Sequence, residues 1–219
     1  MPEIVIMKEI KGRNEEYAKA NREKLSVDHV LMVNVMGAPG AGKTSFLMAL
    51  CKELKDRGIR SAVIEGDLYS TIDTDDFVKE GFDSVQINTE GECHIDANVV
   101  RQGYDKLGFT DGVLFIENVG NLICPAEFDL GEGLRIITAS VPEGDDKPYK
   151  YVPMYSYVDA VVLTKCDLKE AVGFDTDHFT KGLRAINDAP VYETSVKRLE
   201  EATGIGEVAD LIESKYKVV

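Results

Sequence analysis

The sequence lacks several features that would each indicate a different class of protein. No apolar run approaches the ~20 residues that span a bilayer, and residues 1–8 lack the charged-then-apolar pattern of a secretory signal. Positive charge is scarce, because 25 Lys and Arg stand against 39 Asp and Glu, for a formal net charge of −14. Nucleic acid and anionic membranes repel an acidic surface, so we expect neither as a partner. We expect a cytoplasmic protein.

Cysteine is also sparse and scattered. The four cysteines, at positions 51, 93, 124 and 166, do not form the pattern of a disulfide framework, and a cytoplasm would keep them reduced. The chain has no internal repeat and no low-complexity segment. Its 219 residues, 44% apolar and 29% charged, suffice for one α/β domain with a substantial core.

Apolar strand-like segments alternate with helical stretches along the chain. The expected strands are Val30–Met36, Ser61–Glu65, Ser84–Asn88, Val113–Glu117, Arg135–Ala139, Ala160–Thr164 and Val191–Thr194. Helical stretches include Val99–Leu107, Phe179–Ile186 and Ile205–Lys215. This alternation predicts a mostly parallel sheet of about seven strands with helices on both faces. A polar opening with a short amphipathic helix over Lys11–Lys24 predicts an N-terminal helical extension, residues 1–27, before the main domain, residues 28–219.

A glycine-rich segment directly follows the first predicted strand and precedes a helical stretch. It matches G-x-x-x-x-G-K-[ST], which makes the α/β fold a P-loop NTPase. Its glycines let amide N–H groups converge on phosphate oxygens, and the helix N-terminus adds partial positive charge. We expect Lys43 to reach the β- and γ-phosphates and the Thr44 hydroxyl to bind Mg²⁺. The expected phosphate-binding residues are Gly37, Ala38, Pro39, Gly40, Ala41, Gly42, Lys43, Thr44 and Ser45.

A second motif, Thr164-Lys165-Cys166-Asp167, ends another apolar strand. A carboxylate at Asp167 can accept two hydrogen bonds from the N1–H and the exocyclic amine of guanine, and adenine offers no such pair of donors. The motif is weak alone, because Lys and Asp are common at strand ends, but it gains specificity after a P-loop. We expect GTP or GDP as ligand, with Lys165 and Asp167 at the base and Ser195 and Val196 beside it.

Acidic residues at two other strand ends are candidates for Mg²⁺ binding and hydrolysis. Glu117-Asn118-Val119-Gly120 stands where P-loop hydrolases carry a carboxylate facing Mg²⁺ and a glycine whose amide senses the γ-phosphate. Asp67 and Asp73 lie in the candidate switch segment. The simpler interpretation of each acid is a solvated strand-end carboxylate. The candidate Mg²⁺ ligands are Thr44, Asp67 and Glu117, and the candidate catalytic residues are Lys43, Asp67, Asp73, Glu117 and Gly120.

Thiols and an imidazole raise the question of a second metal. Cys93, His94 and Cys124 all follow predicted strands on the nucleotide side, and such ligands suit Zn²⁺ or Ni²⁺. One chain supplies only these three groups, so a complete site needs water, another ligand or a second chain. The alternative is that these cysteines are structural.

Two segments resemble the hydrogenase nickel-incorporation GTPase family, HypB, of the SIMIBI-type P-loop GTPases. They are Gly91–Ala97, which holds the Cys-His pair, and Glu117–Ala126, which holds Cys124; the P-loop and Pro142–Pro148 fit the same family. The resemblance implies that Cys93, His94 and Cys124 bind nickel or zinc and that GTP favours a homodimer. It also implies nickel delivery to the large subunit of a nickel-iron hydrogenase together with a second nickel-maturation factor, with slow GTP hydrolysis.

The chain departs from many members of that family near its beginning. Residues 1–30 contain no Cys and one His, so neither a cysteine-rich nor a histidine-rich nickel motif is present there, and Asn98 stands where some relatives have His. Three other functions are weighed against this one. A urease-type nickel chaperone GTPase normally has a Cys-Pro-His triplet, and a P-loop small-molecule kinase usually lacks a guanine motif. A purely regulatory GTPase would bind nucleotide but no metal.

Overall fold

The strands form one sheet. The computed structural model describes residues 7–67, 72–89 and 91–219, and of residues 7–11, 67, 72 and 73 the backbone alone. The strands are β1 (Val30–Gly37), β2 (Ser61–Asp67), β3 (Asp83–Asn88), β4 (Gly112–Glu117), β5 (Leu134–Ser140), β6 (Ala160–Thr164) and β7 (Val191–Glu193). Within the described ranges these seven strands are all parallel, in the order β3-β2-β4-β1-β5-β6-β7. The carboxyl ends of all seven strands therefore meet at one edge of the sheet.

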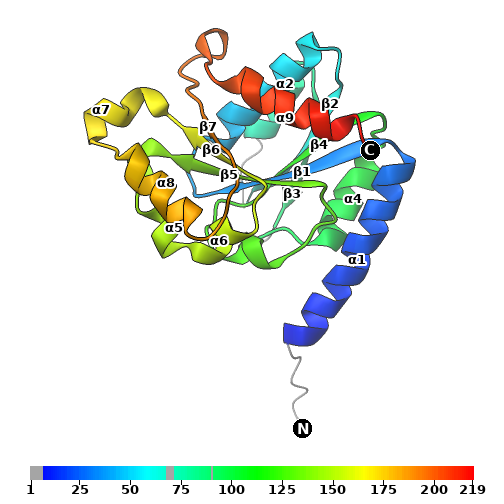
Figure 1. Cartoon of the computed structure of the whole chain (residues 1–219). Helices are drawn as coiled ribbons and strands as arrows, with labels where there is room; N and C mark the ends of the chain where they lie inside the picture. The colour runs from blue at the N-terminus through cyan, green and yellow to red at the C-terminus, as the bar shows by residue number, and fades with distance from the viewer. Residues whose placement is uncertain (1–6, 68–71, 90) are drawn as a thin grey trace.

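Helices cover both faces of the sheet (Figure 1). One face packs against α2 (Lys43–Asp56), α3 (Ile72–Lys79) and α9 (Ile205–Tyr216). The other face is covered by α1 (Met7–Val27), α4 (Ala97–Leu107), α5 (Lys147–Lys150), α6 (Val152–Ser156) and α8 (Thr176–Arg184). The shorter elements are α7 (Lys169–Val172), η1 (Cys124–Glu127), η2 (Val141–Glu143), η3 (Cys166–Leu168) and η4 (Leu199–Glu201).

The central strand β1 is buried on both sides, which explains why all its side chains except that of Asn34 are apolar. Val33 and Val35 pack beneath α2 and α9, whereas Val30 and Met32 face α1 and α4. A strand buried on both faces cannot alternate apolar with polar residues. No helix in the described part of the chain is both long and apolar enough to cross a bilayer.

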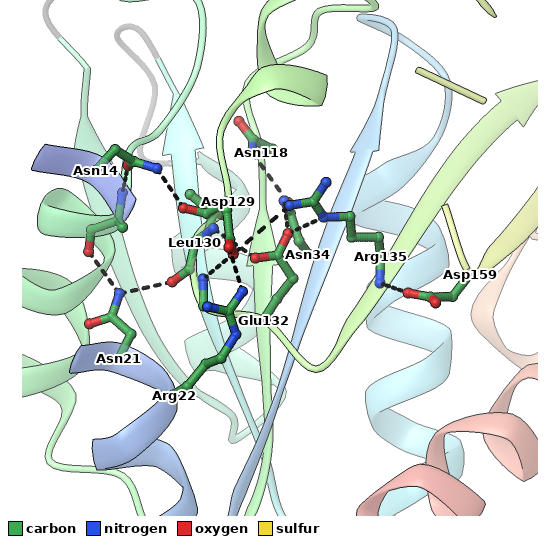
Figure 2. A network of polar contacts seen from close by, with 12 residues as sticks. Asn14, Asn21, Arg22, Asn34, Asn118, Asp129, Leu130, Glu132, Arg135 and Asp159 are labelled. Atoms are coloured by element: carbon green, nitrogen blue, oxygen red, sulfur yellow. Dashed lines mark hydrogen bonds and ion pairs between the residues drawn. The ribbon is translucent and has the colours of Figure 1, made fainter. Parts of the chain in front are cut away.

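The N-terminal helix is longer than the predicted Lys11–Lys24 and attaches through polar side chains. Asn21, 4% exposed, donates hydrogen bonds to the carbonyl oxygens of Ala97 (2.8 Å) and Leu130 (2.9 Å). Asn14 donates to the Asp129 carbonyl oxygen at 2.7 Å and accepts from the Ala97 N–H at 2.9 Å (Figure 2). Side-chain hydrogen bonds therefore hold the helix to the start of α4 and to the segment before β5.

Helix boundaries differ from expectation where a side chain caps the helix. The predicted stretch Phe179–Ile186 is in fact α8, Thr176–Arg184. The helix begins earlier because the Asp175 carboxylate accepts a 2.9 Å hydrogen bond from the His178 N–H and so satisfies one of the unpaired donors of the first turn.

Candidate nucleotide and metal site

The glycine-rich segment forms a tight loop between β1 and α2. Gly40 and Gly42 have φ of 75° and 84°, in the left-handed region that favours glycine, and Gly42 immediately precedes α2. At Gly37 a Cβ would lie 2.3 Å from Thr138 Oγ1 on β5, so no larger residue fits. The sequence-predicted phosphate-binding residues 37–45 therefore form a tight loop, called the phosphate loop below, and the first turn of α2.

Several of the predicted phosphate and Mg²⁺ ligands meet where this loop faces β2 and β4, a place called the phosphate corner below. The Thr44 hydroxyl donates to Glu117 Oε1 at 2.8 Å, and Lys43 Nζ donates to the Ala38 carbonyl oxygen at 3.3 Å. Gly120 lies against the loop, because a Cβ there would approach Pro39 atoms to 3.0 Å. A cavity of about 280 Å³ is bounded here by Pro39, Gly40, Lys43, Thr44, Glu65, Gly66 and residues 117–120.

Glu65 is a member of this corner that sequence reasoning missed. Its carboxylate is 2% exposed, accepts a hydrogen bond from the Thr74 hydroxyl of α3, and lies in register with Glu117 on the neighbouring strand. A charged residue inside the otherwise apolar run of β2 was the available signal. Asp67 ends β2 and Asp73 lies in α3, but their side chains are outside the described part of the chain.

The predicted guanine motif, residues 164–167 (called the base motif below), is hydrogen-bonded to the phosphate loop. The Thr164 hydroxyl donates to the Ala41 carbonyl oxygen at 2.6 Å, and Lys165 Nζ donates to the Gly40 carbonyl oxygen at 2.7 Å. A second, separate cavity of about 340 Å³ shares Thr44 with the first. It is lined by Thr44, Ser45, Met48, Asp76, Lys79, Glu80 and residues 196–199.

Asp167 lies at the carboxyl end of the sheet beside β7. Its carboxylate accepts a hydrogen bond from the Ser195 hydroxyl and lies 3.3 Å from Lys197 Nζ. These two contacts, the Ser195 hydrogen bond first, hold the pKa of Asp167 below its usual value. The group is therefore ionised at neutral pH, as acceptance of two donors requires. The structure brings Asp167 and Ser195 into contact, next to Val196 in the chain, although only Val196 of the three lines the second cavity.

The thiols of Cys93 and Cys124 lie together. Their hydrogen bond, followed by burial, raises the pKa of the Cys93 thiol. Cys93 Sγ is 3.7 Å from His94 Nδ1, and the His94 ring stacks on Phe128 with centroids 3.8 Å apart. Sequence reasoning did not single out Phe128.

The donor set at these residues fits a borderline-soft metal ion but is incomplete within one chain. Burial lowers the pKa of His94, so its imidazole is neutral near pH 7 and able to coordinate. Nevertheless, no group of three His, Cys, Asp or Glu side chains within the described ranges is arranged to surround an ion. To bind a metal ion in four-fold coordination, these three side chains would have to move closer together, and a fourth donor would have to come from water, another ligand or a second chain.

Comparison with known proteins identifies the family. A profile of the CobW/HypB/UreG nucleotide-binding domain matches residues 31–193. The probable hydrogenase maturation factor HypB of Methanocaldococcus jannaschii is 39% identical over 216 residues, 98% of this chain and 96% of that protein. The chain belongs to the HypB family. The resemblance noted in the two cysteine-bearing segments is thereby confirmed.

Other HypB relatives agree in sequence and in structure. The hydrogenase maturation factor HypB of Rhizobium leguminosarum is 42% identical over 79% of this chain, which spans only 58% of that protein. The crystal structure of Helicobacter pylori HypB in complex with nickel superposes with a TM-score of 0.87 at 32% identity, over 94% of this chain and 95% of that one. The predicted α/β P-loop NTPase fold is confirmed by this match and by the parallel sheet.

Proposed function

We propose that this chain is a GTP-hydrolysing switch that delivers nickel during maturation of a nickel-iron hydrogenase. One observation carries the proposal: residues 117–124 begin at the phosphate corner, where Glu117 accepts from Thr44, and end at Cys124, whose thiol contacts Cys93. A single short segment therefore belongs to both the nucleotide site and the thiol pair.

Guanine specificity rests on Asp167. Its carboxylate is ionised and lies at the carboxyl edge of the sheet after β6, where two donors of a guanine base would replace Ser195 and Lys197 as its partners. Adenine would leave a carboxylate without matching donors, which disfavours ATP and a role as a small-molecule kinase.

Hydrolysis rests on the residues of the phosphate corner. Thr44 and Glu117, with Asp67 of β2, would hold Mg²⁺, which when bound neutralises charge on the β- and γ-phosphates. Lys43 provides a further positive charge for the γ-phosphate, and the amide of Gly120 lies beside the loop where it can sense that group. Asp73 in α3 belongs to the switch segment. We expect slow turnover, because a switch needs one hydrolysis per delivery.

Nickel is the cargo, and zinc is the alternative occupant of the same donors. Cys93, His94 and Cys124 supply two thiolates and one neutral imidazole once the thiols lose their protons. Because these three do not surround an ion alone, we propose that a second copy completes the site across a two-fold axis in a GTP-favoured homodimer. The hydrogenase large subunit and a second nickel-maturation factor are the proposed partners, supported by the names of the relatives.

A metal titration tests the proposal. Purified protein is titrated with Ni²⁺ in GDP and in a non-hydrolysable GTP analogue, while stoichiometry and oligomer mass are followed together. We expect nucleotide-dependent binding that both Cys93→Ala and Cys124→Ala abolish. Cys51→Ala is the matched control, because it also removes one thiol but from the buried core beneath α2. Good GTP binding without any stoichiometric metal would contradict the nickel assignment.

A further inference from the structure

The segment of residues 117–124 contains two asparagines whose side-chain oxygens accept hydrogen bonds from backbone N–H groups. The segment lies along the phosphate loop, because Gly120 packs on Pro39 and the Asn121 N–H donates to the Gly37 carbonyl oxygen at 3.1 Å. Any displacement of this segment by nucleotide therefore moves whatever its side chains hold.

Asn118 holds the segment that carries the Cys-His pair. Its side chain is 1% exposed, and Oδ1 accepts from the N–H of Ile95 at 3.3 Å and of Val119 at 2.9 Å. Ile95 directly follows His94 in the chain. On its other side Asn118 Nδ2 donates to Asn34 Oδ1 at 3.2 Å, which anchors the amide to β1 (Figure 2).

Asn121 holds the second thiol. Its Oδ1 accepts from the N–H of Ile123 at 2.7 Å and from the N–H of Cys124 at 3.3 Å. The backbone of Cys124 is thus set by the side chain of a residue that itself bonds to the first residue of the phosphate loop.

We propose that Asn118 and Asn121 are positioning residues that transmit nucleotide state to the metal site, Asn118 through Ile95 to Cys93 and His94, and Asn121 to Cys124. The proposal rests on the proposed function and deepens it. The two bonds to Asn118 Oδ1 are buried, so they move with the segment rather than leave a backbone N–H without an acceptor. The bonds to Asn121 Oδ1 are more exposed but span only two and three residues, so they keep Cys124 fixed relative to Asn121. The two thiols, each attached to the same segment by a different asparagine, change their separation and orientation when that segment shifts.

Such coupling is reciprocal. If the protein binds Ni²⁺ more tightly when residues 117–120 have their GTP-bound arrangement, bound Ni²⁺ must raise the affinity for the GTP analogue by the same factor. A coupling of about tenfold corresponds to ~1.4 kcal/mol, within the usual range for two linked sites. Either nucleotide state can be the one that binds Ni²⁺ more tightly. The proposal is that the two asparagines determine how large the difference in Ni²⁺ affinity is.

The test compares Ni²⁺ affinity in GDP and in a non-hydrolysable GTP analogue, by competition with a chromophoric chelator and by thiolate-to-nickel absorption. The variants are Asn118→Ala, Asn121→Ala and the conservative Asn121→Asp, which keeps the acceptor oxygen. Asn187→Ala is the control, because Asn187 also makes three side-chain hydrogen bonds, to Tyr155, Val158 and Ala189, but near α8. Nucleotide affinity without metal checks that each variant is folded.

We expect the two alanine variants to bring the ratio of affinities to within about twofold of one, while Asn121→Asp and Asn187→Ala keep the wild-type ratio of about tenfold. If Asn118→Ala does not fold, Asn121→Ala carries the test, since Asn121 is only half-buried. A wild-type ratio that both alanine variants retain overturns the role of the asparagines and leaves the proposed function standing. A wild-type protein that binds Ni²⁺ identically in both nucleotides overturns the coupling itself.

Discussion

Glu65 and Glu117 occupy the same register position on the adjacent strands β2 and β4, and both are buried beside the phosphate loop. Neighbouring strands lie about 5 Å apart, so two carboxylates face one small volume. The hydroxyls of Thr74 and Thr44 donate to them, one from each side. A site with this concentration of negative charge disfavours a polyphosphate until a cation is present.

Replacing Glu65 with glutamine tests that electrostatic relationship. Glu65→Gln removes one negative charge without changing volume, so GDP should bind better in EDTA and gain less from Mg²⁺. We expect the ratio of GDP affinities with and without Mg²⁺ to fall about tenfold, or ~1.4 kcal/mol. Thr74→Val is the control, because it removes the hydrogen bond to Glu65 but leaves the charge. An unchanged ratio in Glu65→Gln would exclude a role for this carboxylate at the cation.

Removing the Asp167 carboxylate should abolish the preference for guanine. Asp167→Ala loses two charge-assisted hydrogen bonds to the base, so we expect GTP affinity to fall about 100-fold or more. ATP binding, which gains nothing from Asp167, should change by less than about threefold. Fluorescent-analogue competition measures both affinities. Equal losses for GTP and ATP would indicate a collapsed loop instead of a lost base contact.

A methyl group at Gly120 should affect GTP more than GDP. The Cβ of Gly120→Ala would lie 3.0 Å from three Pro39 atoms, so the loop and the sensing amide must separate by a few tenths of an ångström. We expect about a tenfold loss of affinity for a GTP analogue and little change for GDP, since only the γ-phosphate reaches that amide. Gly12→Ala, in α1 with no atom within 4 Å of the new Cβ, is the neutral control. Equal weakening of both nucleotides would argue against γ-phosphate sensing.

Asp28 should make stability depend on pH. Hydrogen bonds from Lys24, first, and from Tyr104 hold the pKa of this carboxyl below its ordinary value of 3.8. A lowered folded-state pKa gives stability that is present above the unfolded pKa and lost as pH falls through the folded one. We expect Asp28→Asn to lower Tm at pH 7 by about 2–4 °C and to differ less from wild type below about pH 3.8.

Thermal unfolding at pH 7 and at pH 3 measures this effect. Asp111→Asn is the matched control, because it makes the same charge change at an exposed residue before the neighbouring strand β4, and the Asp111 N–H donates to the Asp28 carbonyl oxygen. A difference between wild type and Asp28→Asn that stays constant across this range would show that the carboxyl charge is irrelevant.

The features predicted correctly from sequence are those set by neighbours along the chain. The apolar run of β1 followed by the glycine loop predicts strand, turn and helix locally, and parallel strands then bring the motifs to one edge. The polar attachment of α1 was not predictable. On this helix the aromatic Tyr17 is 44% exposed, whereas the polar Asn14 and Asn21 are buried. Their partners lie 76 to 115 positions away, and no local pattern reports such contacts.

The same limit explains the surroundings of the thiols. The sequence identifies Cys93 and His94 through their chemistry. The stacking of Phe128 on His94 could not be predicted in this way, because the two residues lie far apart in the sequence and in different loops. Likewise, the sequence identifies Asn118 only as a neighbour of Glu117, because the Ile95 N–H that donates to its side chain lies just before α4, 23 positions away.

The bonds of Thr164 to Ala41 and of Lys165 to Gly40 make the cleft mechanically asymmetric. On the β6 side, the predicted base motif is hydrogen-bonded directly to the phosphate loop. The distance between the two is therefore fixed, and we expect a nucleotide to bind only if its base and phosphates match that distance. On the β2 and β4 side, Thr74 and Gly120 make side-chain and van der Waals contacts that a γ-phosphate can rearrange. We therefore expect the β6 side to determine which base is bound, and the β2 and β4 side to respond to the presence of a γ-phosphate.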